Sequence, residues 1–333
     1  MRVDRGYLFW GIFFVLLGAI PLADREGWIR VGGLGDVWRL WPLILIGIGA
    51  AILFSRTSLG LVVTVVAAVV LGSLAGTALT SVGGGVFDCV RTGPATGLER
   101  TTANGTLSPG SEVGVRIDCG DLRVSTAPGG GWSLDAGHGG GPPRVDASST
   151  DLSIEPAEGA PRRQDWVLAL PGSLGSLRVD SNASSATLDL TGATVARLRS
   201  NVNAGDLHVT APSGQMDSLE LEANAADVDL LAPSVDIANL DVEANAASIE
   251  LRLGGSVTGS IEGAAMSVRV CVPSTSALEI HTTDDFAFAE ELQATGLVET
   301  DDGWTRAGSG PRVELTVGGT AASFTLADEE ACA

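Results

Sequence analysis

The chain has 333 residues, of which 45% are hydrophobic, and its net charge at pH 7 is −20. All 20 basic residues are arginine, set against 40 acidic residues, so no basic surface exists that could neutralise a nucleic-acid backbone, and nucleic-acid binding is excluded. The hydrophobic fraction is too high for a disordered chain, and the 44 glycines favour a β-rich protein with many turns.

Apolar residues are concentrated at the front of the chain. Three nearly uncharged runs predict transmembrane helices over residues 6–23, 37–55 and 59–82. A helix rises about 1.5 Å per residue, so runs of this length approach the thickness of a bilayer core. We therefore predict a helical transmembrane region over residues 1–86, embedded in the lipid bilayer.

The flanks of these runs favour membrane spans over a secretion signal. Tyr7 and four of the seven tryptophans lie near the ends of the runs or in the short loop between the first two, where amphipathic rings prefer the headgroup level. Cleavage of residues 1–23 as a signal peptide is the alternative, and it is disfavoured because Pro21 stands where a small residue is needed. Arg2 and Arg5 precede the first span, so we expect the N-terminus inside the cell and, after three spans, the rest of the chain outside the cytoplasm.

The remainder of the chain is predicted to be a β domain over residues 87–333. Short alternating segments such as VGVRIDCGDLRVS and VELTV, separated by Gly, Pro, Ser and Asn, are typical of strands and turns. The stretch over residues 127–163 contains PGGGWS, HGGGPP and EGAPRR, and we expect long loops there.

An internal repeat of 21 residues is the most informative feature of this domain. A leucine or isoleucine recurs with this period, at Leu177, Leu198, Leu219, Leu240 and Ile261. An asparagine followed by alanine recurs with the same period, at Asn182, Asn203, Asn224 and Asn245. A period near 20 with strand-like alternation in each unit predicts a β-solenoid, in which each coil buries its inward residues against the next coil.

The alternation also predicts which side chains point inward. The expected inward residues of two successive coils are Leu219, Leu221, Val228, Leu230, Val235, Ile237, Leu240, Val242, Ile249 and Leu251. The recurring asparagine is expected at a bend, where its amide bonds to backbone or to the same residue one coil away. We expect this role to be structural, with ligand binding as the alternative.

Stacking would also align acidic residues on the outer surface. Glu222 would lie beside Glu243 at a strand spacing of about 4.8 Å, where like charges repel by roughly 0.9 kcal/mol in water. Two further pairs are expected, Asp206 with Asp227 and Asp229 with Glu250. Calcium could relieve this repulsion, but the glycine-aspartate nonapeptides of calcium-binding β-rolls are missing, so we predict a solvated acidic face and no metal site.

The four cysteines do not have the spacing of a zinc or redox motif; they are Cys89, Cys119, Cys271 and Cys332. An even number outside the cytoplasm permits two disulfides, and the least demanding of three connectivities joins Cys89 to Cys119 and Cys271 to Cys332. Unpaired thiols are the alternative.

No pattern in the sequence supports an enzyme. His138, His208 and His281 are far apart, and no HExxH, GxSxG or phosphate-binding glycine loop accompanies them. We expect all three histidines to be exposed, and we expect no catalytic residue and no cofactor. A carbohydrate-active enzyme would need a groove with clustered carboxylates, and the outward acidic pairs are too open for that role.

The segments RGYLFWGIFFVLLGAI and WPLILIGIGAAILF resemble the LiaI/LiaF-type transmembrane region of bacterial envelope-stress proteins. The repeat domain resembles the toastrack, or "putative adhesin", β domains that often accompany that region. The resemblance implies a non-enzymatic membrane protein that senses or modulates cell-envelope stress, contacts a sensor kinase or another membrane protein, and engages an envelope component. The alternative is a surface adhesion module or structural scaffold held by its membrane helices.

Overall fold

A computed structural model describes residues 97–158, 163–283, 296–300, 303–320 and 322–332. The chain divides into two units, Met1–Phe87 and Asp88–Ala333, and all described residues belong to the second, here called the β unit. The three predicted membrane spans and Cys89 lie outside the described residues. Within the described residues, no helix is long and apolar enough to cross a membrane.

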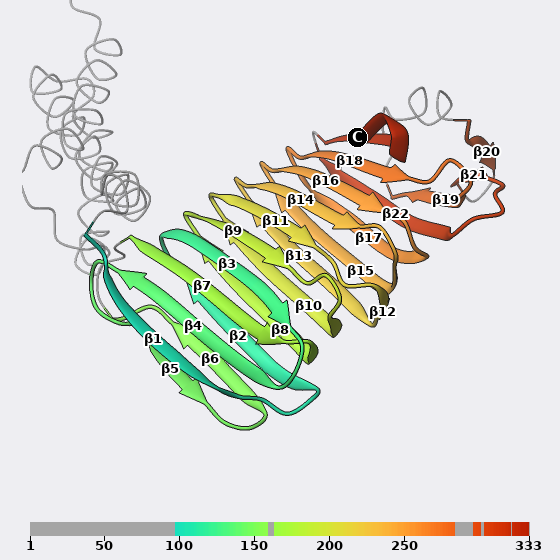
Figure 1. The fold of residues 1–333 in the computed structure, drawn as a ribbon. Helices are drawn as coiled ribbons and strands as arrows, with labels where there is room; N and C mark the ends of the chain where they lie inside the picture. Colours follow the sequence, from blue (N-terminus) through green and yellow to red (C-terminus); the bar gives the residue numbers. More distant parts are fainter. Residues whose placement is uncertain (1–96, 159–162, 284–295, 301–302, 321, 333) are drawn as a thin grey trace, which may run out of the picture. The chain divides into compact units, whose positions relative to one another are not determined.

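The β unit is built almost entirely of strands, arranged in two large sheets (Figure 1). Sheet A has ten strands, in the spatial order β1 (Glu99–Thr106), β4 (Gly131–His138), β7 (Gln164–Pro171), β3 (Gly120–Ala127), β9 (Ser184–Asp189), β11 (Asp206–Thr210), β14 (Asp227–Ala232), β16 (Ser248–Leu253), β18 (Ser267–Val272) and β23 (Ser323–Asp328). Sheet B has thirteen strands, in the order β20 (Val298–Thr300), β21 (Gly303–Arg306), β19 (Ala277–Thr282), β22 (Arg312–Thr320), β17 (Val257–Ala264), β15 (Val235–Asn245), β13 (Ser218–Asn224), β10 (Thr194–Asn203), β8 (Ser173–Asn182), β2 (Ser111–Ile117), β6 (Asp151–Glu155) and β5 (Arg144–Ala147), with β12 (Gly214–Met216) beside β15.

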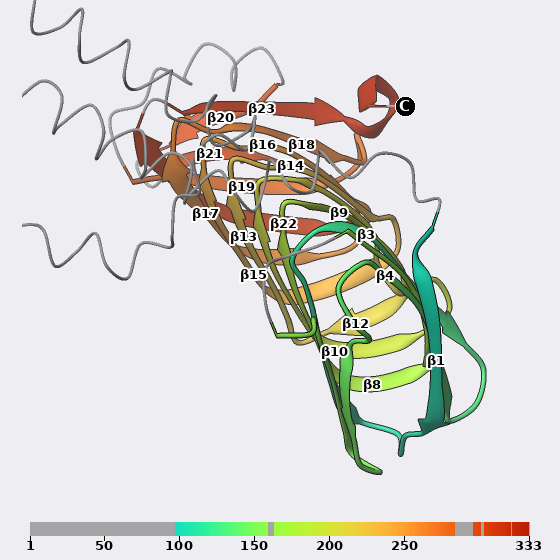
Figure 2. The same ribbon diagram turned by 90° about the vertical axis from the view of Figure 1, so that its left-hand side faces the viewer.

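The chain winds between the two sheets as a stack of coils. Each central coil places one strand in sheet B and the next in sheet A, and each strand pairs in parallel with its counterparts in adjacent coils. Leu177, Leu198, Leu219 and Leu240 are consecutive partners in sheet B. Figure 2 shows the coils stacked from the green strands near the start of the unit to the red strands near its end.

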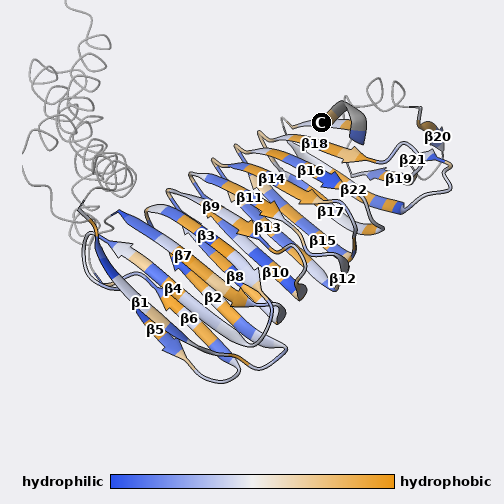
Figure 3. Ribbon diagram, in the orientation of Figure 1, coloured by the Kyte–Doolittle hydropathy of each residue, from blue (hydrophilic) through white to orange (hydrophobic). Residues whose placement is uncertain are grey.

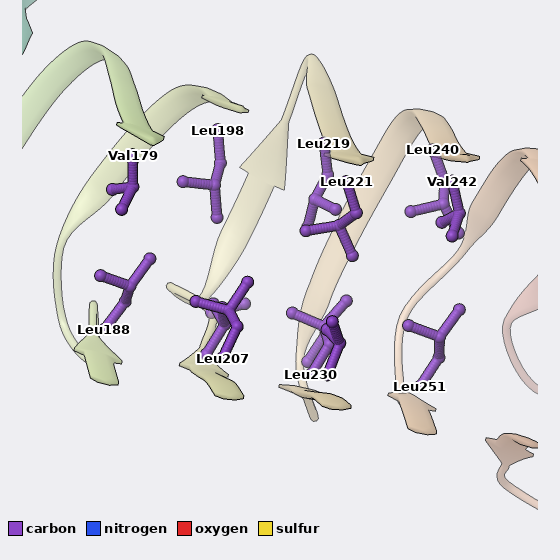
Figure 4. Packing of buried hydrophobic residues seen from close by; sticks show 14 of the residues in the cluster. Val179, Leu188, Leu198, Leu207, Leu219, Leu221, Leu230, Leu240, Val242 and Leu251 are labelled. Carbon is purple, nitrogen blue, oxygen red and sulfur yellow. The ribbon is translucent and has the colours of Figure 1, made fainter. Parts of the chain in front are cut away.

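The core lies between the sheets, because the strands of the central coils alternate inward apolar and outward polar residues (Figure 3). All ten side chains predicted to point inward are at most 4% exposed, which confirms that prediction. Leucines of sheet B, such as Leu219 and Leu240, face leucines of sheet A, such as Leu230 and Leu251, across the core (Figure 4). The apolar side chains of a coil are therefore fully buried only when another coil stacks on each side of it.

The 21-residue register changes at two neighbouring places. Ala232 still pairs with Leu253, but Ile237 pairs with Val257, so the connection between β16 and β17 is one residue shorter than its counterpart in the coil before. β15 contains an irregularity between residues 237 and 240, after which Leu240 pairs with Gly259, and Val242 pairs with Ile261. The expected step from Leu240 to Ile261 is therefore wrong, since Ile261 continues the row of Val242. Glycine occupies the place beside Leu240 because a Cβ there would lie 2.6 Å from the Leu240 Cβ and would collide with backbone.

The described residues of the range 127–163 are not mainly long loops, contrary to expectation. They contain β4, β5 and β6, and β4 forms antiparallel ladders with both β1 and β7. Trp132 and Leu134 of β4 are buried in the core. The glycine-rich segments PGGG and HGGGPP provide the turns before and after β4, so their composition marks strand connections.

Two coils do not follow the chain order. The coil of β2 and β3 lies between the coil of β6 and β7 and the coil of β8 and β9. At the opposite end, β22 lies between β17 and β19, although it follows both in the chain. Antiparallel strands then flank both ends of the stack: β1, β4 and β5 at one end, and β20 and β21 at the other.

Candidate functional site

The recurring asparagines form a hydrogen-bonded ladder along one corner of the stack, where sheet B turns toward sheet A. The Nδ2 of Asn203 donates to Oδ1 of Asn182 over 3.1 Å, Asn224 donates to Asn203 over 3.1 Å, and Asn245 donates to Asn224 over 3.2 Å. All of these bonds run in the same direction. The amides therefore link four coils at their outer edge.

A carboxylate stands at the acceptor end of this ladder. Asn182 Nδ2 donates to Asp118 Oδ1 over 3.1 Å, and the same oxygen accepts a 3.1 Å bond from Arg116 Nε. A side branch joins the ladder to the outer face of sheet B, because Asn201 Oδ1 accepts from Asn203 over 2.9 Å and Asn201 Nδ2 donates to Glu222 over 2.9 Å. The corner is thus a polar network of amides with a carboxylate at each of two ends, Asp118 at the acceptor end of the ladder and Glu222 at the end of the branch.

The alanine after each asparagine has a specific conformational role. Ala183, Ala204, Ala225 and Ala246 have φ between 47° and 57°, in the left-handed region that L-residues rarely adopt. The N–H of Ala204 donates to the Asn224 carbonyl of the next coil over 2.9 Å, and the other alanines make equivalent bonds. Such a turn needs a small side chain, so the Asn-Ala dipeptide marks the corner, although its left-handed backbone was not predicted from the sequence.

A shallow groove of about 630 Å³ runs along this corner, across several coils. It is lined by Ala225, Ala226, Asp227, Ala246, Ala247, Ser248, Ala265, Met266, Ser267, Ala322 and Ser323. Each coil therefore contributes small or apolar side chains followed by one hydroxyl or carboxylate group. The groove is open, and its lining does not include an imidazole, thiol or arginine.

The outer face of sheet B changes in charge along the stack. Arg199 bonds to Glu220 over 3.1 Å and to Glu222 over 2.6 Å in the next coil. The hydrogen bond to Asp180 and its negative charge raise the pKa of Arg178 above its ordinary value. In the next two strands of sheet B, the positions that pair in register with Glu222 are occupied by Glu243 and then Glu262. Within the described residues, Glu243 and Glu262 have no ion-pair partner.

The predicted acidic pairs occupy the expected positions. Glu222 and Glu243 are strand partners, and the same is true of the pairs Asp206 with Asp227 and Asp229 with Glu250. Neighbouring cations compensate some of them: Arg252 lies 2.6 Å from Glu250, whose hydrogen bond raises the pKa of Arg252. In the part of the chain that the structure describes, no group of three or more His, Cys, Asp or Glu residues could hold a metal ion.

The three histidines lie on different strands and do not form a common site. His138 is not exposed as expected: it lies on β4, is 5% exposed, and its Nε2 lies 2.9 Å from Thr101 Oγ1. The strand alternation that buries Trp132 and Leu134 also turns His138 inward. His208 and His281 lie beside acids on outer faces, 3.8 Å from Asp229 and 3.3 Å from Glu279 respectively.

The aromatic residues that the structure describes are part of the core of the β unit. Trp132, Trp166, Trp304 and Phe324 are at most 6% exposed. Among the described residues, no aromatic ring is therefore displayed as a platform on which a sugar ring could stack. The outer surfaces instead offer carboxylates, amides and hydroxyls.

The described cysteines are all in disulfides. Cys271 of β18 is bonded to Cys332, which follows β23 in a short 3-10 turn, Glu329–Cys332. Their Cα atoms are 6.3 Å apart, within the usual range for a disulfide. Cys119, in the turn between β2 and β3, is also disulfide-bonded, and its partner lies outside the described residues.

Comparison with solved structures gives distant matches to this chain. One is a "putative cell adhesion protein" from Clostridium sporogenes, 9% identical, covering 69% of this chain and 100% of that chain with a TM-score of 0.31. A "putative adhesin" from Bacteroides fragilis is 9% identical, covering 69% and 97% with a TM-score of 0.34. A "putative lipid binding protein" from Parabacteroides distasonis is 10% identical, covering 69% and 97% with a TM-score of 0.30. None of the curated proteins matches this chain significantly.

The first part of the chain gives a family match. Residues 8–53 match the model of the LiaI-LiaF-like transmembrane region. The match covers most of the two segments whose pattern resembles that region, RGYLFWGIFFVLLGAI and WPLILIGIGAAILF. The chain is therefore a membrane-associated protein with a LiaI-LiaF-like transmembrane region, followed by a β unit of two large sheets.

Proposed function

We propose that this protein senses or modulates stress on the bacterial cell envelope, acting by binding and not by catalysis. The observation that carries the proposal is the match of residues 8–53 to the LiaI-LiaF-like transmembrane region. The membrane segment would contact a sensor kinase or another membrane protein, and the β unit would engage an envelope component.

Cysteine chemistry supports a position of the β unit outside the cytoplasm. Disulfides persist in oxidising compartments and are rare where glutathione and thioredoxin keep thiols reduced. Cys271, Cys332 and Cys119 are all disulfide-bonded. Three membrane spans with an inside N-terminus would place the β unit on the same, extracytoplasmic side.

The surface of the β unit favours a polar or cationic ligand. The aromatic residues among the described ones are buried, so this part of the β unit does not offer a ring on which a sugar could stack. The row of Glu222, Glu243 and Glu262 on sheet B is only partly compensated, by Arg199. Carboxylates in successive coils attract cationic groups over about 10 Å at moderate ionic strength.

A functional test compares matched charge variants of the full-length protein in its own cells. Asp241→Asn/Glu243→Gln/Glu262→Gln removes three charges from sheet B, and the control Asp206→Asn/Asp227→Asn/Asp229→Asn removes three charges from sheet A. We expect the sheet B variant to change the induction of an envelope-stress reporter and the recovery of a membrane partner, while the control does not. If deletion of residues 97–333 changed neither readout, the proposal would be wrong.

The side of the membrane is tested separately with a membrane-impermeant thiol reagent on intact cells. We expect labelling of cysteines only after prior reduction. Labelling that requires cell lysis would contradict an extracytoplasmic β unit. Surface binding by the protein without any effect on the stress reporter would instead favour an adhesion or scaffold role.

A further inference from the structure

The last coil of the chain occupies a place that was left open by the strands before it. This terminal coil consists of β22 and β23, residues 312–328. β19 precedes β22 in the chain, yet β22 lies between β17 and β19 as a parallel partner of both. The rest of the β unit thus presents a slot between β17 and β19 that accepts one strand.

The contacts that hold the terminal coil in this slot are extensive. β22 pairs with β17 over Val257–Ala264, and β23 pairs with β18 over Ser267–Val272. Five of its side chains are buried in the core, at 0–4% exposure: Val313, Leu315, Val317, Phe324 and Leu326. Without the terminal coil, the core of the preceding coil and the edges of β17, β18 and β19 would be exposed, which is unfavourable.

A short exposed segment connects the terminal coil to the rest of the unit. Residues 307–311, with the sequence AGSGP, join the end of β21 to the start of β22, and residues 307–310 are exposed. On one side of this segment, Arg306 forms a 3.2 Å ion pair with Asp328 of β23. On the other side, Arg312 forms a 2.8 Å ion pair with Glu279 of β19. Short hinges of this kind favour exchange of the element that they connect.

The contacts described above could all form equally well between two copies of the chain. A second copy offers the same slot and the same ion-pair partners, so only the path of residues 307–311 would differ. The Cys271–Cys332 disulfide is the one covalent bond between the described part of the slot and the end of the terminal coil. We infer that the terminal coil is exchangeable between two copies of this chain, and that this disulfide retains it in its own stack.

The test uses two full-length copies with different tags, expressed in the same cells. One copy carries Thr258→Cys on β17 and the other carries Glu314→Cys on β22, positions that are strand partners within one stack. Both copies also carry Cys271→Ser/Cys332→Ser. Because each copy has only one cysteine of the reporting pair, a two-tag cross-link above the level of random collision requires the terminal coil of one copy to pair with β17 of the other.

We expect at least a tenfold greater yield of the two-tag product than from a control pair, Thr258→Cys with Thr187→Cys, in which Thr187 is exposed on sheet A. With Cys271 and Cys332 retained, we expect the yield to fall to the control level. A yield at the control level without the disulfide would overturn coil exchange, and an undiminished yield with the disulfide would overturn its retaining role.

A second pair of variants separates loss of exchange from loss of folding. Cys271→Val/Cys332→Ala replaces the buried disulfide with apolar side chains, which suits the 1% exposure of Cys271. Protease resistance of the β unit shows which background is folded. A folded background that gives no cross-link above control refutes the inference.

Discussion

Removal of one rung from the asparagine ladder should have a cost that depends on the position of the rung. Asn224 donates to Asn203 and accepts from Asn245, so Asn224→Ala removes two amide hydrogen bonds. A hydrogen bond contributes about 0.5–1.5 kcal/mol net, and we expect a loss of about 2 kcal/mol in the free energy of unfolding. Asn245→Ala removes one bond at an exposed position and should cost about half as much.

Urea unfolding of the full-length protein in detergent, followed by the circular dichroism of the β-sheet, measures these differences. Asn239→Ala is the matched control, because Asn239 is an exposed asparagine of β15 that makes no side-chain hydrogen bond among the described residues. Hydrogen exchange should locate the effect of Asn224→Ala in the coils on either side. If Asn224→Ala and Asn239→Ala unfolded at the same urea concentration, water would replace the ladder bonds without cost, and the reasoning would be refuted.

Three further predictions use the same unfolding assay. The Ser200 hydroxyl is buried without a hydrogen-bond partner among the described residues, in a row of aliphatic side chains, so Ser200→Val should stabilise the protein by about 1–2 kcal/mol; a loss of stability would contradict this. Ala225 has a φ of 49°, a conformation that costs an L-residue about 1–2 kcal/mol. Ala225→Gly should therefore be neutral or slightly stabilising, and Ala225→Val should be clearly destabilising. Equal changes in stability for the two variants would contradict this reasoning. Hydrogen bonds from Thr191 lower the pKa of Asp189, so its contribution to stability should be present above about pH 4 and be lost as the pH falls through the lower, folded-state pKa. Asp189→Asn should therefore lower stability at neutral pH, with a difference that disappears in acid; a difference independent of pH would exclude this role.

The central coils could be predicted from the sequence because every signal there is local and repeated. Alternating residues such as Leu219 and Leu221 identify the inward face, and the constant step between Asn203 and Asn224 gives the register. The same step led to a wrong expectation for Ile261, because the connection between β16 and β17 and the irregularity in β15 each shorten the step by one residue without a clear sequence signal. A period describes the average coil and does not detect a local bulge.

The two ends of the β unit were less predictable because their contacts are between distant parts of the chain. Glycine-rich composition concealed β4, whose buried Trp132 and His138 depend on antiparallel partners on both sides. The insertion of β22 between β17 and β19 also has no local signal, because pairing order is determined by the assembled sheet. The groove beside Ala225 was missed for the same reason, since it exists only when several coils are stacked.

The repeated coil allows the length of the β unit to change in equal steps. Deletion of residues 204–224 would remove one whole repeat and join β10 to β14 with every inward and outward position preserved. Each step would shorten the stack by about 4.8 Å, the spacing of neighbouring strands. The end coils cannot change in this way, because their neighbours in space are not their neighbours in sequence. Duplication and loss of repeats during evolution should therefore be confined to the middle of the stack, where they would adjust the reach of the protein without altering either end.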